Sequence, residues 1–177
     1  MSKLSLINAS CADLEVDAVV NAANGYLMAG GGICGVIFAK AGRIQLEDAC
    51  AKYKVPLPDG STVITPAFNM RNAKYIIHAV GPDFGAKPKA FDKLFDAYYN
   101  SLRTLMENGL TSISFPLISS GIFGGRLKNP VAESTKQCIL AYNKFTKDYP
   151  DYCVEVILCA YAKSEMAEAQ EVFAKMV

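Results

Sequence analysis

The chain has 177 residues, of which 51% are hydrophobic and 20% charged, a balance typical of one globular domain with a buried core. Its 18 basic and 17 acidic side chains give a formal net charge of +1, so it lacks the basic field with which proteins hold many nucleic-acid phosphates. No apolar run is long enough to span a membrane, and no secretory signal follows Met1. We therefore expect one cytoplasmic domain over residues 1–177, with neither a membrane nor a specific nucleic acid as its partner.

The six cysteines have no spacing typical of a metal site. They form no Cys-X-X-Cys pair, and the chain has only one histidine to add to them. Scattered reduced thiols in an apolar chain are the simpler interpretation. We therefore expect no metal ion and no redox or transfer cofactor.

Strand-like and helix-like segments alternate along the chain. Short apolar runs predict buried strands over 17–23, 74–80, 112–118 and 154–161, with weaker strands nearer the sheet edges over 4–8 and 61–65. The segment 33–53 is helical in character, and apolar spacings of three and four predict helices over 91–106, 131–145 and 166–176. This alternation predicts an α/β fold in which helices cover both faces of a mostly parallel sheet.

A glycine-rich loop connects the strand at 17–23 with the helix that follows it. The loop runs from Asn21 to Gly35 and contains three successive glycines, Gly30, Gly31 and Gly32. Glycine allows the backbone to approach a ligand closely, and a helix start offers free N–H groups and a positive dipole end. Since ligands of such sheets bind at the carboxyl ends of the strands, we expect an anion here.

A second loop with the same features follows the strand that ends near Ile118. It reads SSGIFGG over residues 119–125, so it combines small residues and exposed amides with one aromatic ring, Phe123. Either loop by itself is also compatible with an ordinary turn. Two such loops at neighbouring strand ends suit a diphosphate.

Four motifs occur in order along the chain: NAAN at 21–24, GGG at 30–32, HAVGP at 78–82 and SSGIFG at 119–124. This series resembles the macrodomain family, from about Leu4 to Phe173. The resemblance implies a three-layer α/β/α fold with a mixed, mostly parallel six-stranded sheet. It also implies a cleft for ADP-ribose or for an ADP-ribosylated protein.

The resemblance implies a role for several side chains. Asn24 reaches the distal ribose, where an amide can both donate and accept hydrogen bonds, and Phe123 packs beside the same ribose; these two are the candidate catalytic residues. Tyr161 stacks on adenine, with an ordinary core or rim tyrosine as the alternative. Asn21 is expected to order the loop through side-chain-to-backbone bonds, and His78 to be structural, with a general base as the alternative. The implied ligand-binding residues are Ser10, Cys11, Asn24, Gly31, Gly32, Ile33, Cys34, Ser119, Ser120, Gly121, Ile122, Phe123 and Tyr161.

Two positions depart from the family pattern. Ser10 stands where many members carry an Asp that accepts from the adenine amino group, and a hydroxyl is a weaker acceptor; Asp13 or Asp17 could compensate. Cys34 stands where hydrolytic cellular members often carry an Asp, so this loop is more similar to viral-type members. We expect Cys34 to be a small residue that lets the ligand approach, with a nucleophilic thiol as the alternative.

Three functions are compatible with these features. The first is hydrolysis of ADP-ribose from acidic side chains, or of O-acetyl-ADP-ribose, and Asn24, Phe123 and the two glycine loops favour it. The second is a non-catalytic reader of ADP-ribosylated proteins or of a free nucleotide of this type, favoured by the missing carboxylates. The third, a phosphoesterase acting on the 1″-phosphate, has neither a dedicated base nor a metal site to support it. We expect the hydrolase, with the reader as the alternative.

Overall fold

The computed structural model describes all 177 residues. Its elements, in chain order, are β1 (Lys3–Asn8), the short 3-10 helix η1 (Cys11–Asp13), β2 (Val16–Ala23), α1 (Gly32–Ala41), α2 (Arg43–Cys50), β3 (Thr62–Pro66), β4 (Ala73–Val80), α3 (Phe91–Glu107), β5 (Ser112–Phe115), the 3-10 helix η2 (Ile122–Gly124), α4 (Pro130–Asp148), β6 (Glu155–Ala160) and α5 (Lys163–Met176). No helix is long and apolar enough to cross a membrane.

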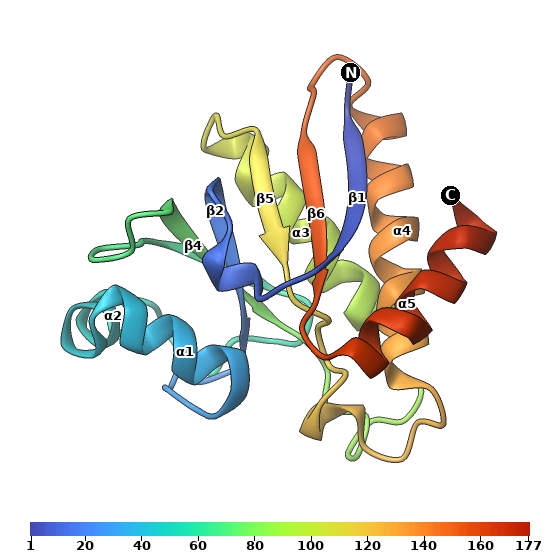
Figure 1. Ribbon diagram of the computed structural model, residues 1–177. Coiled ribbons are helices and arrows are strands. Elements are labelled where there is room, and N and C mark those ends of the chain that lie inside the picture. The colour runs from blue at the N-terminus through green and yellow to red at the C-terminus, as the bar shows by residue number, and fades with distance from the viewer.

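The strands form one six-stranded sheet in the order β1-β6-β5-β2-β4-β3. All neighbouring strands are parallel except β3, which pairs with β4 in the antiparallel sense. Helices α1 and α2 cover one face and α3, α4 and α5 the other, so the molecule has three layers (Figure 1). The predicted α/β/α architecture with a mixed, mostly parallel sheet is confirmed.

The central strand β2 is buried on both faces, which explains its nearly continuous apolar run. Ala18 and Val20 belong to the core beneath α3 and α4, whereas Val19 and Ala23 belong to the core beneath α1 and α2. Successive side chains of a strand point to opposite faces, so a strand covered on both sides has no polar alternation.

The sheet has a switch in its connections between β2 and β5. After β2 the chain crosses by α1 and α2 towards β3 and β4, and after β5 it crosses by α4 to β6, on the other side and over the other face. In open α/β sheets, ligands bind outside the carboxyl ends of the strands at such a point. Both glycine-rich loops begin there.

Two predicted elements differ from the structure. The helical segment 33–53 is broken into α1 and α2 at Gly42, whose φ of 105° is not helical. The strand predicted over 112–118 ends at Phe115, since Pro116 has no N–H to donate to a neighbouring strand. The weaker strands were expected near the edges, and β1 and β3 are the two edge strands.

Candidate functional site

The predicted site residues lie at the carboxyl ends of the strands, at the lower end of the sheet in Figure 1. Ser10 and Cys11 follow β1, Tyr161 follows β6, residues 119–123 follow β5, and residues 24–34 follow β2. These four strands are neighbours in the sheet and run in the same direction. The fold therefore brings segments from both ends of the chain together at the carboxyl ends of four neighbouring strands.

The first loop contains a run of backbone donors that have no acceptor in the protein. The N–H groups of residues 30–34 donate to no group of the protein. A β-carbon added at Gly30, Gly31 or Gly32 would meet no atom within 4 Å, and Gly32 has a φ of 58°. Because α1 begins at Gly32, its positive dipole end reinforces these donors. The arrangement can hold an anion.

The second loop presents a similar set of donors from the next strand. The N–H groups of Ser119 and of residues 121–123 also have no acceptor in the protein, and a β-carbon at Gly121 would meet nothing within 4 Å. Ser119 holds the loop in place, with a φ of 59° and an Oγ that donates to the Pro82 carbonyl oxygen at 2.7 Å. The Ser120 Oγ donates to the Leu117 oxygen at 2.8 Å, so its hydroxyl also serves the turn.

Asn24 maintains the shape of the first loop. Its Oδ1 accepts from the N–H groups of Tyr26 and Met28, both at 3.1 Å, and its Nδ2 donates to the Met28 oxygen at 2.9 Å. The loop-ordering role predicted for Asn21 therefore belongs to Asn24. One N–H of the Asn24 amide has no partner and is free to donate to a ligand.

Asn21 bonds to His78 instead of the loop, which corrects the prediction. The two residues are register partners in β2 and β4, and the Asn21 Nδ2 lies 3.1 Å from the His78 Nδ1. Since an amide Nδ2 can only donate, the Nδ1 accepts, and the Nε2–H donates to the Thr65 Oγ1 at 3.0 Å. Burial lowers the pKa of His78 to about 4, so the ring is neutral near pH 7. His78 is fully buried, with the Phe38 ring of α1 close to it, and this favours the structural role over the general base.

Two glycines outside the predicted set allow the loops to approach their neighbours. A β-carbon on Gly81 would lie 2.4 Å from the Ser119 Oγ, and one on Gly35 would lie 2.6 Å from the Gly30 carbonyl oxygen. Gly35 could have been found in the sequence, because a glycine within a helix costs stability and so indicates a packing reason. Gly81 could not, since its contact joins the ends of two different strands.

The Cys34 thiol faces the inside of the first loop. The residue is buried, and its Sγ donates to the Met28 oxygen at 3.6 Å. No histidine or carboxylate bonds to this sulfur. The geometry therefore favours Cys34 as a small residue that lets the ligand approach, and not as a nucleophile.

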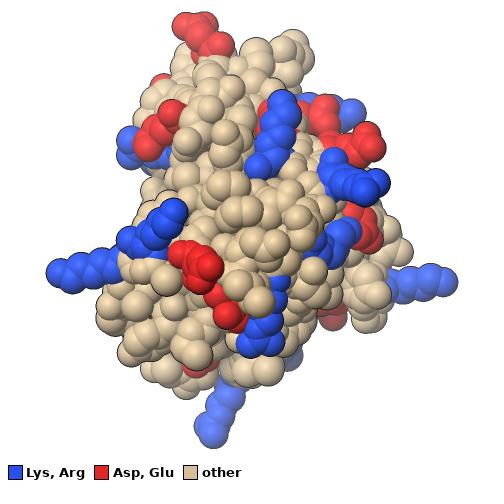
Figure 2. Space-filling view, turned by 90° about the vertical axis from the view of Figure 1, so that its left-hand side faces the viewer, with Lys and Arg blue, Asp and Glu red and all other residues tan.

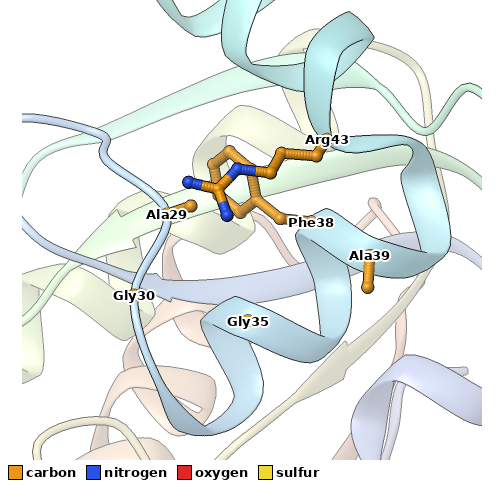
Figure 3. Close-up of a pocket in the computed structure, with 6 residues that line it drawn as sticks. All are labelled: Ala29, Gly30, Gly35, Phe38, Ala39 and Arg43. Atoms are coloured by element: carbon orange, nitrogen blue, oxygen red, sulfur yellow. The ribbon is translucent and has the colours of Figure 1, made fainter.

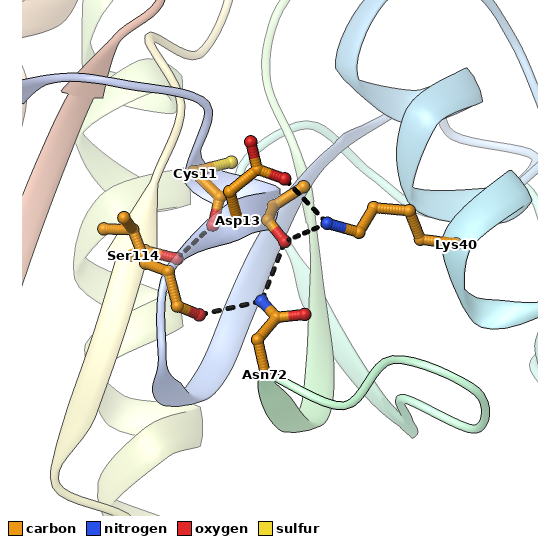
Figure 4. A network of polar contacts seen from close by, with 7 residues as sticks. Cys11, Asp13, Lys40, Asn72 and Ser114 are labelled. Atoms are coloured by element: carbon orange, nitrogen blue, oxygen red, sulfur yellow. Dashed lines mark hydrogen bonds and ion pairs between the residues drawn. The ribbon is translucent and has the colours of Figure 1, made fainter.

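A polar network fixes η1, which carries Cys11 (Figure 4). The Ser114 Oγ donates to the Cys11 oxygen at 2.8 Å, and the Asn72 Nδ2 and Lys40 Nζ donate to the Ala12 oxygen at 2.8 and 3.1 Å. The Cys11 thiol points inward to the Val20 oxygen at 3.6 Å, and burial raises its pKa. The Cys11 thiol is therefore not available to a ligand. Sequence reasoning missed the three donors, because each comes from a different segment of the chain.

The two carboxylates proposed to compensate for the missing Asp have other partners. The Asp13 Oδ1 forms an ion pair with the Lys40 Nζ at 2.7 Å. Asp17 lies at the amino end of β2, at the opposite edge of the sheet from the loops, where it accepts from the N–H groups of Thr111 and Ser112. Burial acts to raise the pKa of Asp17, but these hydrogen bonds outweigh it and lower the value. Asp17 is thus a structural residue and does not compensate.

Tyr161 has a fixed backbone and a free ring. The Asn8 Nδ2 donates to the carbonyl oxygens of Ala160 and Tyr161 at 2.8 and 2.9 Å, while 76% of Tyr161 is exposed. Such a ring is available for stacking against a flat ligand. A rim tyrosine would have the same exposure.

A hollow of about 280 Å³ lies behind the first loop, between the loop and α1 (Figure 3). It is lined by Ala29, Gly30, Gly35, Phe38, Ala39 and Arg43. None of these belongs to the second loop, and the Arg43 Nε is paired with the Glu47 Oε1 at 2.7 Å. The free N–H groups of the two loops, and not this hollow, form the candidate site.

The sheet topology and the two loops define an α/β/α protein that can hold an anionic ligand through backbone N–H groups. Residues 20–134 match the family model described as Macro domain. This chain therefore belongs to the macrodomain family, as the motif series predicted.

Relatives and solved structures agree with this assignment. The chain is 43% identical over 121 residues to an uncharacterised protein of Pyrobaculum aerophilum, covering 67% of this chain and 65% of that protein. It is 34% identical over 165 residues to the ADP-ribose glycohydrolase MACROD1 of Mus musculus, covering 92% of this chain and 49% of MACROD1. The chain thus spans about half the length of that hydrolase. A Trypanosoma brucei macrodomain solved in complex with ADP-ribose superposes with a TM-score of 0.83 at 28% identity, covering 96% of this chain and 68% of the other.

Proposed function

We propose that this protein binds ADP-ribose and hydrolyses it from ADP-ribosylated acidic side chains or from O-acetyl-ADP-ribose. The observation that carries the proposal is the pair of adjacent loops whose N–H groups have no acceptor in the protein and whose glycines border open space. A diphosphate is the anion that two such loops at neighbouring strand ends would fit. The name of MACROD1 and the ADP-ribose bound to the Trypanosoma brucei macrodomain support this choice of ligand.

The strand order, taken with the roles that the family resemblance implies for Asn24 and Phe123, supports one direction for the ligand across the strand ends. With the diphosphate between the loops after β2 and β5, the distal ribose would lie by Asn24 and Phe123. Adenine would then extend across β6 towards Tyr161 and the backbone of Cys11, which follow β6 and β1. The pocket for the base would have no carboxylate at Ser10, so its selectivity for adenine would depend on stacking and backbone contacts.

Catalysis in this site would rest mainly on positioning. The first loop has no carboxylate at position 34, and His78 is buried and neutral. The free N–H of Asn24 would orient the distal ribose or an attacking water, and the Phe123 ring would restrict the ribose from the other side. Holding the reactants in an attacking geometry supplies a large part of many enzymatic accelerations.

The alternative is a non-catalytic reader, which the missing carboxylate at Cys34 favours. The two are separated by incubating the protein with a target mono-ADP-ribosylated on glutamate and measuring free ADP-ribose. Release at a rate that Cys34→Ala leaves unchanged supports the hydrolase, whereas ADP-ribose binding without release supports the reader. Loss of release in Cys34→Ala would instead indicate a thiol nucleophile. In a reader, hydrolysis gained by Cys34→Asp would show that the carboxylate alone was missing.

We also propose that residues 1–177 form one domain that works in the cytoplasm. The parallel pairing of β1 with β6 joins the two ends of the chain in one sheet, which supports one domain. All six cysteines are free thiols, five of them buried, and unpaired thiols are typical of a reducing compartment.

A further inference from the structure

Two loops meet directly behind Phe123. The β4–α3 loop (residues 81–90) and the end of the β5–α4 loop (residues 121–129) are joined by the Phe84 N–H, which donates to the Phe123 oxygen at 2.8 Å. A β-carbon on Gly125, whose φ is 57°, would lie 2.3 Å from the Gly85 nitrogen. The two backbones are therefore in direct contact, and their side chains share one surface beside the candidate site.

That surface carries an excess of positive charge. Lys87, Lys89, Arg126 and Lys128 are all exposed, and only Lys87 has an ion-pair partner, the Asp59 Oδ2 at 2.7 Å. We call the three unpaired cations, Lys89, Arg126 and Lys128, the basic rim.

None of the carboxylates nearest to the basic rim in sequence forms an ion pair with its three cations. Asp83 Oδ1 accepts from the Gly85 N–H at 2.9 Å, and Glu133 Oε1 accepts from Gln137. Asp92, in the first turn of α3, is exposed and pairs with none of the three cations. On the face that carries α1 and α2, by contrast, basic and acidic side chains are interspersed (Figure 2). The two loops themselves, residues 81–90 and 121–129, contain four basic residues and one acidic residue, Asp83, so their excess of positive charge is local.

We propose that the basic rim binds an acidic stretch of the polypeptide that carries ADP-ribose; this inference rests on the proposed function. The polypeptide is attached at the distal ribose, next to Phe123, so it must leave the cleft near the loops that pack behind that residue. Three exposed cations suit a few carboxylates of a peptide. They are too few for a nucleic-acid backbone, and no exposed aromatic ring stands among them for bases to stack on.

The test compares two peptides that carry ADP-ribose on one central residue through an amide nitrogen, a linkage chosen to resist hydrolysis. Glutamates flank that residue in one peptide and glutamines in the other. The wild-type protein should bind the acidic peptide about tenfold more tightly at low salt, the combined effect of a few exposed ion pairs. The preference should shrink at about 300 mM salt.

The variant Lys89→Glu/Arg126→Glu/Lys128→Glu should lose or reverse this preference. Its matched control, Lys52→Glu/Lys54→Glu/Arg71→Glu, reverses three exposed, unpaired cations outside the two loops and should keep the preference. The ratio of the two peptide affinities is taken within each variant, so any long-range effect on the diphosphate cancels. Thermal unfolding of each variant checks its fold.

A wild-type protein that binds free ADP-ribose yet prefers neither peptide would overturn the inference and leave the proposed function intact. The inference would also be overturned if the rim variant preferred the acidic peptide as strongly as the control variant does. So would a rim variant that weakens binding of an ADP-ribosylated oligonucleotide alone, since the partner would then be a nucleic acid. If free ADP-ribose does not bind at all, the proposed function fails first.

Discussion

The backbone of Gly35 lies so close to Gly30 that a β-carbon on Gly35 would approach the Gly30 carbonyl oxygen to 2.6 Å. Gly35→Ala should therefore displace the first loop, although alanine is the better helix former. We expect the free energy of unfolding to fall by about 1–3 kcal/mol and ADP-ribose to bind more weakly. Urea denaturation and calorimetry measure the two effects. Val36→Ala, an exposed change on the same helix, is the control, and a stabilised Gly35→Ala protein would contradict the close contact.

Gly31→Glu should abolish binding of the diphosphate while the protein stays folded. Gly31 has an extended backbone with a φ of −85° and open space around its α-carbon, so a side chain causes no strain. Gly32, with its φ of 58°, would not give such a clean result, because any side chain there is strained. Gly31→Gln separates charge from bulk and should bind better than Gly31→Glu. Normal ADP-ribose affinity in both variants would place the phosphates elsewhere.

Changes at Asn24 should separate loop order from ligand contact. Asn24→Ala loses three hydrogen bonds within the loop, so we expect ADP-ribose affinity and turnover to fall together, the affinity by about tenfold. Asn24→Asp keeps an acceptor for the N–H groups of Tyr26 and Met28 but removes the amide donor. Its carboxylate is repelled by the Met28 oxygen and by the diphosphate, so its ADP-ribose affinity should also fall, while urea denaturation reports the loop order that it keeps; it should release little product. If Asn24→Asp turns over substrate like the wild type, the free amide N–H has no role in the reaction.

Tyr161→Ala should weaken ADP-ribose binding by about 1–3 kcal/mol if the exposed ring stacks on adenine. Tyr161→Phe keeps the flat ring and should bind like the wild type. Because adenine is the part that stacks, ADP-ribose and AMP should lose comparable free energy in Tyr161→Ala. Unchanged calorimetric affinity in Tyr161→Ala would assign the ring to the rim.

The stability of the protein should fall as the pH is lowered from 7 to 5, because of His78. The unfolded chain takes up a proton near pH 6.5, whereas burial lowers the pKa of His78 in the folded protein to about 4. Between these values unfolding takes up a proton, so acid favours the unfolded state and the stability returns as the pH rises. The expected loss between pH 7 and pH 5 is about 2 kcal/mol.

His78→Gln provides the control for this pH dependence, since its amide oxygen can still accept from Asn21. His78 is the only histidine, so the variant should show an almost flat stability between pH 5 and 7 by urea denaturation. An equal slope in the variant and the wild type would show that His78 titrates normally in the fold.

Much of the fold could be predicted because each element has a local signal. The apolar run of β2 indicates a buried strand, and the apolar spacings of three and four in α3 indicate a helix. The two edge strands have weaker apolar patterns in the sequence. The break at Gly42 and the early end of β5 at Pro116 were missed, although glycine and proline marked both places.

The candidate site could be predicted where glycine runs follow strands, and not where partners come from distant elements. The sequence does not show that the Asn21 amide meets His78, since that contact depends on the pairing of β2 with β4. The contact of Gly81 with Ser119 depends in the same way on the ends of β4 and β5. Ser114 in β5 fixes the Cys11 oxygen, and Lys40 in α1 and Asn72 in the loop before β4 fix the Ala12 oxygen. None of the three has a local pattern that indicates this role.

The central claim is that the N–H groups after β2 and β5 together hold the diphosphate of ADP-ribose, and calorimetric titration of the wild-type protein tests it most directly. We predict binding at micromolar affinity, about −8 kcal/mol, with AMP weaker because it has a single phosphate. If about 1 mM ADP-ribose, a concentration at which even weak binding is detected, gave neither heat nor a thermal shift, the account would be contradicted.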